Sequence, residues 1–229
     1  MYALLDFGDL RIEQRAEHSK VKFHYKNMLV ESFKSYCDIK YHDSIKNFLQ
    51  GIIERDAFSG CANLIKVVIP DSTTKIGKSA FRDCINLTSI EIPEGITSIE
   101  NHAFYYCKSL TSIKIPEGVT SIEDFTFYTC ANLTNITIPN SITSIGDYAF
   151  FGCKNLTGIE IPDNVTSIGE SAFYFCISLS SAIFKNISNW YIGDSAGAKA
   201  TSISSSSLSN TSTAATHLKT TYYSKYWTR

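Results

Sequence analysis

The chain contains 229 residues, of which 44% are hydrophobic, and its formal net charge at pH 7 is −1. This apolar content is sufficient for a packed core, and no apolar run is long enough to span a bilayer. The near-zero charge excludes a general electrostatic attraction to nucleic acid or to an anionic membrane. The opening sequence MYALLDFGDLRIEQR has no basic segment followed by an apolar stretch, so we predict no secretory signal in the chain as written; processing could have removed one.

Residues 1–52 precede the regular part of the chain and are predicted to form a mainly helical N-terminal cap. The strongest signal follows Asp43, which is placed to cap the N-terminus of a helix. Apolar residues then recur at the spacing of one helix face. They are Ile45, Phe48, Leu49, Ile52 and Ile53. Leu29, Phe33 and Tyr36 indicate a further helical turn upstream.

Residues 53–184 carry a repeat of 23 residues, which is the strongest signal in the sequence. All five prolines, six cysteines and six phenylalanines recur at this interval. The prolines are Pro70, Pro93, Pro116, Pro139 and Pro162. The cysteines are Cys61, Cys84, Cys107, Cys130, Cys153 and Cys176, and the phenylalanines are Phe58, Phe81, Phe104, Phe127, Phe150 and Phe173. Three residue types in one register predict a single elongated body.

One unit, ANLTNITIPNSITSIGDYAFFGC, shows how a coil could form. Residues 133–139 end in a period-two pattern that places Ile136 and Ile138 inside, and the proline ends this strand because it has no N–H. Residues 141–146 form a second extended run, whose two isoleucines we expect to be buried. Residues 147–153 indicate a short turn of α- or 3₁₀-helix that returns the chain to its starting side.

A single unit is not expected to be stable alone. Its roughly seven inward side chains would contribute on the order of 10–20 kcal/mol on burial. Fixing the backbone costs roughly 1–2 kcal/mol for each residue, which is more than that gain. Units therefore become stable only by stacking on one another, which predicts an elongated right-handed coil with parallel strands on one face.

The pattern LxxIxIPxxVTxIGxxAFxxC resembles the BspA-like, or Treponema-type, leucine-rich repeats. Matching units begin at Leu64, Leu87, Leu110, Leu133 and Leu156, and a partial sixth begins at Leu179. The chain departs from the commoner leucine-rich repeat, which has Asn or Cys soon after the strand, where this sequence has Ile-Pro. The resemblance implies an α/β solenoid, a curved leucine-rich-repeat coil with its parallel strands on the concave face and a cap at each end. It also implies a cell-surface or secreted protein concerned with adhesion or partner binding.

Residues 185–229 are predicted to form a C-terminal capping segment, and their sequence is similar to the C-terminal segment of bacterial members of this family. Residues 201–213, TSISSSSLSNTST, have the composition of a flexible link, so we predict a loop there. A short helix whose rings cover the last coil is expected to follow, and a disordered end is the alternative. The residues that favour the helix are His217, Leu218, Tyr222, Tyr223, Tyr226 and Trp227.

The regularly spaced cysteines could form disulfides, a metal site or a column of buried thiols. Equivalent side chains on successive coils point in the same direction, which is poor geometry for a disulfide. The paired short spacings of a zinc site are missing from the sequence. We therefore predict buried free thiols that act as small hydrophobic groups, and we predict no metal or cofactor. Cys37 lies outside the repeat register.

The outward side chains of the predicted strand face are the candidate partner-binding surface. They are Lys66, Val68, Ser89, Glu91, Ser112, Lys114, Asn135, Thr137 and Glu160. We expect Glu91 to form a weak surface ion pair with Lys114. Glu91 and Glu160 would lie roughly 14 Å apart at the spacing of stacked strands, whereas glycosidase carboxylates lie about 5–9.5 Å apart. We therefore predict no catalytic residues and no enzyme activity.

A second candidate surface is an aromatic stripe that follows the repeated phenylalanines. It consists of Tyr105, Tyr128, Phe151 and Tyr174. These rings could stack on one another and serve the fold, or they could form an exposed row that partners recognise. An exposed row could also drive self-association.

The sequence favours a non-catalytic protein-interaction or adhesion module with a rigid curved surface. Its expected partner is a protein or an extended glycan, and neither nucleic-acid binding nor membrane insertion is predicted. A structural spacer or scaffold segment of a larger surface protein, with no ligand of its own, is the alternative.

Overall fold

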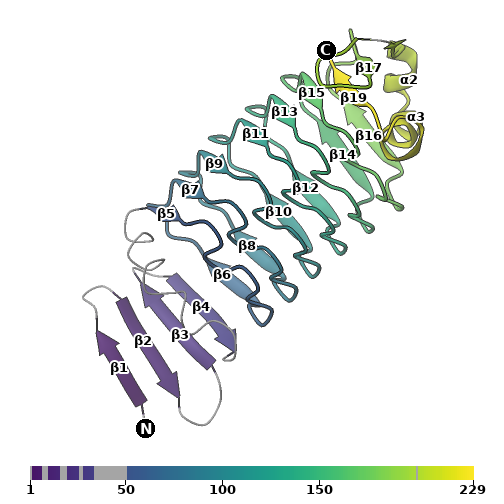
Figure 1. The fold of residues 1–229 in the computed structure, drawn as a ribbon. Coiled ribbons are helices and arrows are strands. Elements are labelled where there is room, and N and C mark those ends of the chain that lie inside the picture. The colour runs from purple at the N-terminus through teal and green to yellow at the C-terminus, as the bar shows by residue number, and fades with distance from the viewer. Residues whose placement is uncertain (1, 7–9, 16–19, 26–27, 34–50, 200) are drawn as a thin grey trace.

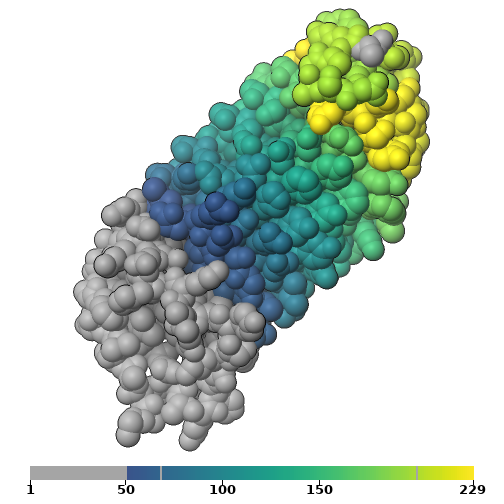
Figure 2. Space-filling model, in the orientation of Figure 1, coloured from purple at the N-terminus to yellow at the C-terminus, as the bar shows by residue number. Residues whose placement is uncertain are grey.

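The computed structural model describes the protein as an elongated coil of stacked turns (Figure 1). The residues that it describes are 2–6, 10–15, 20–25, 28–33, 51–199 and 201–229. Successive coils run along the length of the molecule in chain order, and the C-terminal segment lies at the far end of the coil (Figure 2). The predicted stacking of 23-residue units is therefore confirmed.

One row of strands follows the predicted Leu-to-Pro segments. It consists of β6 (Lys66–Val68), β8 (Ser89–Glu91), β10 (Ser112–Lys114), β12 (Asn135–Thr137), β14 (Gly158–Ile161) and β16 (Ser181–Phe184). The strands pair in parallel between β6 and β8, between β10 and β12, and between β14 and β16, with equivalent residues of successive units opposite one another. We call the outward surface of this row the strand face.

A second row consists of short strands, each of which follows one of the prolines except β5, which precedes the first of them. It consists of β5 (Ile52–Ile53), β7 (Lys75–Ile76), β9 (Ser98–Ile99), β11 (Ser121–Ile122), β13 (Ser144–Ile145) and β15 (Ser167–Ile168). These strands also pair in parallel, in the orders β5-β7-β9 and β11-β13-β15. The second residue of each strand is an isoleucine that is buried in the core, and the first residue, which is a serine from β9 onward, is half-buried.

The third side of each coil is a run of turns, so the predicted helical turn at residues 147–153 is wrong. Tyr148 and Gly152 have positive φ angles of 55° and 69°, which interrupt a right-handed helix. The N–H groups of Tyr148, Phe150 and Gly152 donate to carbonyl groups of the next coil at 2.8–2.9 Å. Because alternate N–H groups point along the coil axis, this side holds neighbouring coils together in the same way as a strand.

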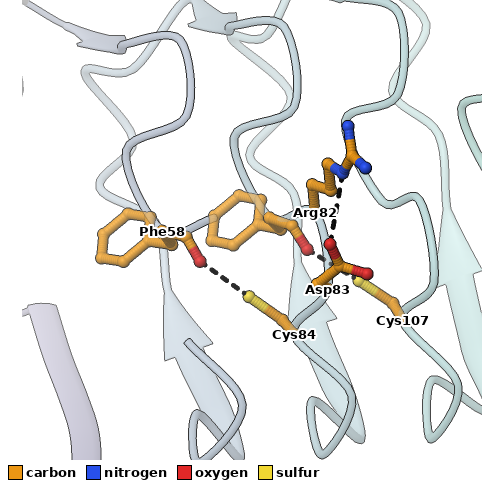
Figure 3. A network of polar contacts seen from close by, with 6 residues as sticks. Phe58, Arg82, Asp83, Cys84 and Cys107 are labelled. Carbon is orange, nitrogen blue, oxygen red and sulfur yellow. Dashed lines mark hydrogen bonds and ion pairs between the residues drawn. The ribbon is translucent and has the colours of Figure 1, made fainter. Parts of the chain in front are cut away.

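The core is one continuous hydrophobic cluster that runs through all the coils. The six repeated phenylalanines are buried at its centre, and neighbouring rings are nearly parallel with centroids 5.1–5.5 Å apart. The six repeated cysteines are buried, as predicted, while Cys37 lies outside the described residues. The Sγ of Cys84 donates to the carbonyl of Phe58 at 3.1 Å (Figure 3).

Threonine is repeated because its hydroxyl group joins one coil to the next. The Oγ1 of Thr134 donates to the carbonyl of Thr111 at 3.0 Å, and the Oγ1 of Thr166 donates to the carbonyl of Thr143 at 3.2 Å. Both partners lie 23 residues earlier in the chain. These bonds satisfy exposed backbone carbonyl groups along two edges of the coil.

The N-terminal part departs from the predicted helical cap, which is wrong where the structure describes it. Four antiparallel strands form a meander, and β4 pairs antiparallel with β6 through Val30 and Val67. The strands are β1 (Tyr2–Asp6), β2 (Leu10–Arg15), β3 (Lys20–Tyr25) and β4 (Met28–Phe33). The physical reason is visible in KVKFHY of β3, where polar and apolar residues alternate with the period of a strand.

The two helical segments predicted in this part have different outcomes. Leu29 and Phe33 lie in β4 rather than in a helical turn, and Tyr36 lies outside the described residues. The helix predicted after Asp43 also falls outside the described residues, except for its last part, where Ile52 and Ile53 form β5.

The C-terminal segment covers the last coil with two helices that lie against β16 and with strands that extend the second row (Figure 1). Its elements are β17 (Tyr191–Gly193), β18 (Thr201–Ser202), α2 (Ser205–Ser209), α3 (Thr211–Thr216), a π-helical turn η1 (His217–Thr221) and β19 (Tyr226–Thr228). Trp190, Leu218 and Trp227 are buried in the shared core. The backbone N–H of Ser171 donates to Tyr223 and that of Arg229 to Thr166, so the tail takes up hydrogen bonds of the last coil.

The predicted loop at residues 201–213 is wrong, because most of this Ser/Thr-rich stretch is helical. The side chains of Ser204 and Asn210 accept hydrogen bonds from backbone N–H groups and cap α2 and α3. Leu208 and Ala214 anchor the two helices in the core. Ser and Thr therefore act here as caps and as the solvent-facing side of short helices.

Candidate functional site

The strand face carries the predicted partner-binding residues in two columns. They are Lys66 and Val68 on β6, Ser89 and Glu91 on β8, Ser112 and Lys114 on β10, Asn135 and Thr137 on β12, and Glu160 on β14. Ser89 is half-buried, and apart from Val68, for which only the backbone is described, the other side chains are exposed. The regular parallel register places equivalent residues of paired strands side by side.

The charges of the strand face pair differently from the prediction. Lys114 Nζ contacts Glu94 Oε1 at 2.6 Å, and no ion pair joins it to Glu91. Glu94 lies in the turn after β8, and from that position its carboxylate contacts Lys114 of the next coil. This hydrogen bond lowers the pKa of Glu94 and raises that of Lys114. Both side chains are exposed, so the ion pair is weak and the two side chains can rearrange.

The carboxylates of the strand face do not converge. Glu160 contacts Lys185 at 3.2 Å, while Glu91 lies on β8, three coils away. Within the part of the chain that the structure describes, no group of three or more His, Cys, Asp or Glu residues is arranged to hold a metal ion. No helix in that part has the length and apolar content needed to cross a membrane.

The aromatic stripe is a stack of rings, which is the structural alternative considered for it. Tyr105 and Tyr128 are 4.8 Å apart between centroids, and Tyr128 and Phe151 are 4.7 Å apart, with planes within 7°. Tyr174 meets Phe151 edge-on and stacks on Tyr223 of the C-terminal segment at 3.9 Å. The four rings are half-buried, and their faces are largely occupied by one another, which leaves mainly their edges for contact.

A parallel stack beside the stripe was not predicted. Phe125 lies between His102 and Tyr148, with centroid distances of 4.8 and 4.9 Å. All three residues have positive φ angles between 55° and 62°. Their 23-residue spacing was visible in the sequence, but their change from imidazole to phenyl to phenol hid the column.

A groove of about 350 Å³ lies where the second strand row meets the C-terminal segment. Residues of three successive coils line it, together with the loop at residues 196–197 and with β19. Glu123, Asp124 and Asp147 supply its charge, and the Tyr226 hydroxyl lies 3.3 Å from Asp147 Oδ2. Burial and the neighbouring Asp147 raise the pKa of Tyr226. The recurrence of Asp124 and Asp147 at the repeat interval was the available sequence signal, but it did not show that the tail would close the groove.

Stacked coils with short parallel strands at a 23-residue interval define a solenoid of the leucine-rich-repeat class. The model of the BspA type leucine rich repeat region matches residues 51–140 and 120–220, with six copies. The chain belongs to this family. Leucine-rich-repeat solenoids of this kind are generally non-catalytic scaffolds that serve as protein-interaction or surface modules.

Solved structures of bacterial proteins share the fold. A leucine rich repeat protein of T. pallidum is 31% identical, with a TM-score of 0.51 over 56% of this chain and 71% of that one. A leucine rich cell surface protein of Faecalibacterium prausnitzii is 28% identical, with a TM-score of 0.55 over 85% of this chain. A leucine-rich repeat protein of Bacteroides ovatus is 27% identical, with a TM-score of 0.52 over 78% of this chain. The chain spans only 59% and 40% of the last two proteins. No curated protein matches the sequence significantly.

Proposed function

We propose that the chain is a non-catalytic binding module whose strand face contacts a protein or an extended glycan at the bacterial cell surface. The observation that carries this proposal is that the strand face exposes side chains that the fold does not use. Ser112 and Thr137 are exposed and make no side-chain hydrogen bond within the described part of the chain. By contrast, the rings of the aromatic stripe stack on one another and the repeated threonines join the coils.

Rigidity supports the same proposal. Each coil is bonded to its neighbours through backbone hydrogen bonds on the strand rows and on the turn side. A partner that binds such a surface loses little free energy to ordering it. The exposed residues are small or of mixed charge, which suits an extended ligand better than a deeply enclosed small molecule. The cell-surface name of the F. prausnitzii protein supports the proposed location.

The test compares two variants in which four exposed residues become alanine. The strand-face variant is E91A/K114A/N135A/E160A. The matched control, N63A/E117A/K154A/D163A, also removes two acids, one base and one amide from exposed positions, but these lie in turns outside the strand rows. Immobilised protein is exposed to bacterial and epithelial surface extracts and to a glycan array, and retained molecules are identified by mass spectrometry or fluorescence.

The strand-face variant is expected to lose at least about tenfold in binding of a molecule that the wild type and the control retain, which corresponds to roughly 1.4 kcal/mol. Thermal unfolding of both variants checks that the fold is intact. Equal retention by the two variants would place binding elsewhere and contradict the proposal. If none of the three proteins retains any molecule, the result would favour the alternative function as a spacer. The six stacked coils would then serve only to hold other parts of a larger protein apart.

A further inference from the structure

We propose that the groove beneath the C-terminal segment is a second binding site, which takes the guanidinium or ammonium group of an arginine or lysine side chain from a peptide partner. The groove lies on the second strand row, between β11, β13, β15 and the tail, and does not include the strand face. Its volume of about 350 Å³ lies at the small end of the range for ligand pockets and is large enough for one arginine or lysine side chain.

Glycines shape the floor of the groove. A Cβ atom at Gly146 would lie 2.5 Å from Asp124 Oδ1, and one at Gly169 would collide with Asp147 Oδ1. The missing side chains allow each aspartate to fold against the backbone of the next coil. Asp124 Oδ1 accepts the N–H of Asp147 at 2.8 Å, and Asp147 Oδ1 accepts the N–H of Glu170 at 2.9 Å. The two carboxylates are therefore held in fixed positions one coil apart.

The charge of the groove is unbalanced. Glu123, Asp124 and Asp147 line it, and no Lys or Arg is among the described residues that line it. The hydrogen bonds to the backbone use one oxygen of each aspartate. The second oxygen of Asp124 has no hydrogen-bond partner among the described residues, whereas that of Asp147 accepts from the Tyr226 hydroxyl. A cationic group would complement this arrangement of fixed carboxylates.

Further polar groups in the groove lack partners. The side chains of Ser144 and Ser167 make no hydrogen bond within the described part of the chain. Thr228 is 7% exposed, and its Oγ1 has no hydrogen-bond partner among the residues that the structure describes. Trp227 points into the core, so alternation along β19 turns Thr228 to the opposite side, the side on which Tyr226 reaches Asp147. A buried hydroxyl group without a partner is costly, which indicates that a hydrogen-bonding group of a ligand belongs at this position, and the hydroxyl oxygen can accept from a donor there.

A guanidinium group matches these features. It presents five N–H donors in a planar fork and accepts no hydrogen bonds, so it can serve carboxylates and hydroxyl oxygens together. The ring of Tyr226 adds an aromatic surface, on which such a cation is attracted to the π-electrons. An ammonium group offers three donors in a smaller volume and would bind more weakly in the same place.

The experiment is a titration of the ¹⁵N-labelled full chain with N-acetyl-argininamide, followed by amide chemical shifts. Saturable shifts are expected at residues 123–124, 146–147 and 167–169, with smaller ones for N-acetyl-lysinamide. N-acetyl-citrullinamide has nearly the same shape without the charge and is expected to give none. Saturable shifts with the citrulline compound, or no saturation with the arginine compound, would overturn the proposal.

Variants locate the site. Asp124→Asn combined with Asp147→Asn keeps an oxygen for each backbone N–H and removes both charges, so the fold is expected to persist while affinity falls at least tenfold. The control is Asp163→Asn, at an exposed turn outside the groove, which should leave affinity unchanged. Equal loss in both proteins would show a general charge effect and contradict the assignment. Competition by Ca²⁺ at concentrations below those of the arginine compound would show an inorganic cation as the ligand and would also contradict it.

Discussion

The Sγ of Cys130 donates a hydrogen bond of 3.2 Å to the carbonyl of Phe104, which lies 26 residues earlier in the chain. The same carbonyl accepts the backbone N–H of Cys107 within its own coil. The relationship recurs from Cys153 to Phe127 and in other coils. The cysteine and phenylalanine columns are therefore one bonded unit, in which the thiol uses the second lone pair of a buried carbonyl.

The repeated thiols should be unreactive in the folded protein. In a Cys37→Ser background, a thiol reagent such as DTNB is expected to modify none of the six repeat cysteines near neutral pH and to modify all six after unfolding, because all six are buried. The absorbance of the thiolate that DTNB releases gives the number of cysteines modified. Fast reaction of even one repeat cysteine in the folded state would contradict the described packing.

Stability should fall in alkali. Burial raises the pKa of the Cys107, Cys130 and Cys153 thiols in the folded state. A cysteine thiol in the unfolded chain has a pKa of about 8.5. Above that pH, the folded state therefore binds more protons than the unfolded state. The free energy of unfolding should then fall by up to about 1.4 kcal/mol per pH unit for each such thiol. Urea denaturation between about pH 7 and about pH 10 measures this slope, and Cys130→Ala should reduce it.

The phenylalanine column should be essential to the core. Phe127 stacks between Phe104 and Phe150, and its side chain is fully buried. Phe127→Ala should lower the free energy of unfolding by about 3–5 kcal/mol, because it leaves a cavity and removes two ring contacts. Chemical denaturation measures the change, and Phe127→Leu, which keeps more volume, should cost less. An unchanged unfolding midpoint for the alanine variant would contradict the central position of this ring.

The aromatic stripe should stabilise the fold through its rings rather than its hydroxyl groups. Tyr128 stacks on Tyr105 and Phe151, and each ring pair contributes about 0.5–1.5 kcal/mol beyond burial. Tyr128→Ala should therefore destabilise the protein by at least about 1–3 kcal/mol. Tyr128→Phe is the control and should unfold like the wild type, because no hydrogen bond of this hydroxyl is described. A large effect of the phenylalanine variant would show that the hydroxyl has a structural role.

Alanine substitutions at two glycines should have opposite effects on stability. Gly169→Ala should destabilise the protein by about 1–3 kcal/mol, because its Cβ would collide with the backbone and side chain of Asp147. Gly158→Ala has its nearest neighbour 3.8 Å away and should stabilise by about 0.4–1 kcal/mol, because it restricts the unfolded chain. Thermal unfolding of both variants provides the comparison, and equal shifts in the same direction would contradict the close contact at Gly169.

The sequence was sufficient for those features that repeat. Phe127 and Cys130 could be placed in the core because the same apolar residue types recur at their positions in every coil. The turns were less predictable, since Phe125 and Thr129 adopt positive φ angles that bulky and β-branched residues seldom take. Here the hydrogen bonds between coils outweigh the local preference.

The ends and the groove could not be predicted because they lack internal repetition. The alternation of polar and apolar residues in β3 indicated a strand within the segment where a helical cap was expected. The ion pair of Lys114 depended on the reach of Glu94 from a neighbouring turn. The groove depended on where Tyr226 returns to the second strand row, a long-range contact that no local pattern encodes.

The hydrogen bonds of the tail have a consequence for how such chains change in length. Ser171 donates to Tyr223 just as Tyr148 donates to Glu170 of a following coil, and Thr166 receives the N–H of Arg229 just as Thr143 receives that of Thr166. The tail thus imitates the next coil at the points where a coil would dock. Because every junction offers the same docking points, whole units can be duplicated or deleted in a gene while one unaltered tail continues to cap the last coil.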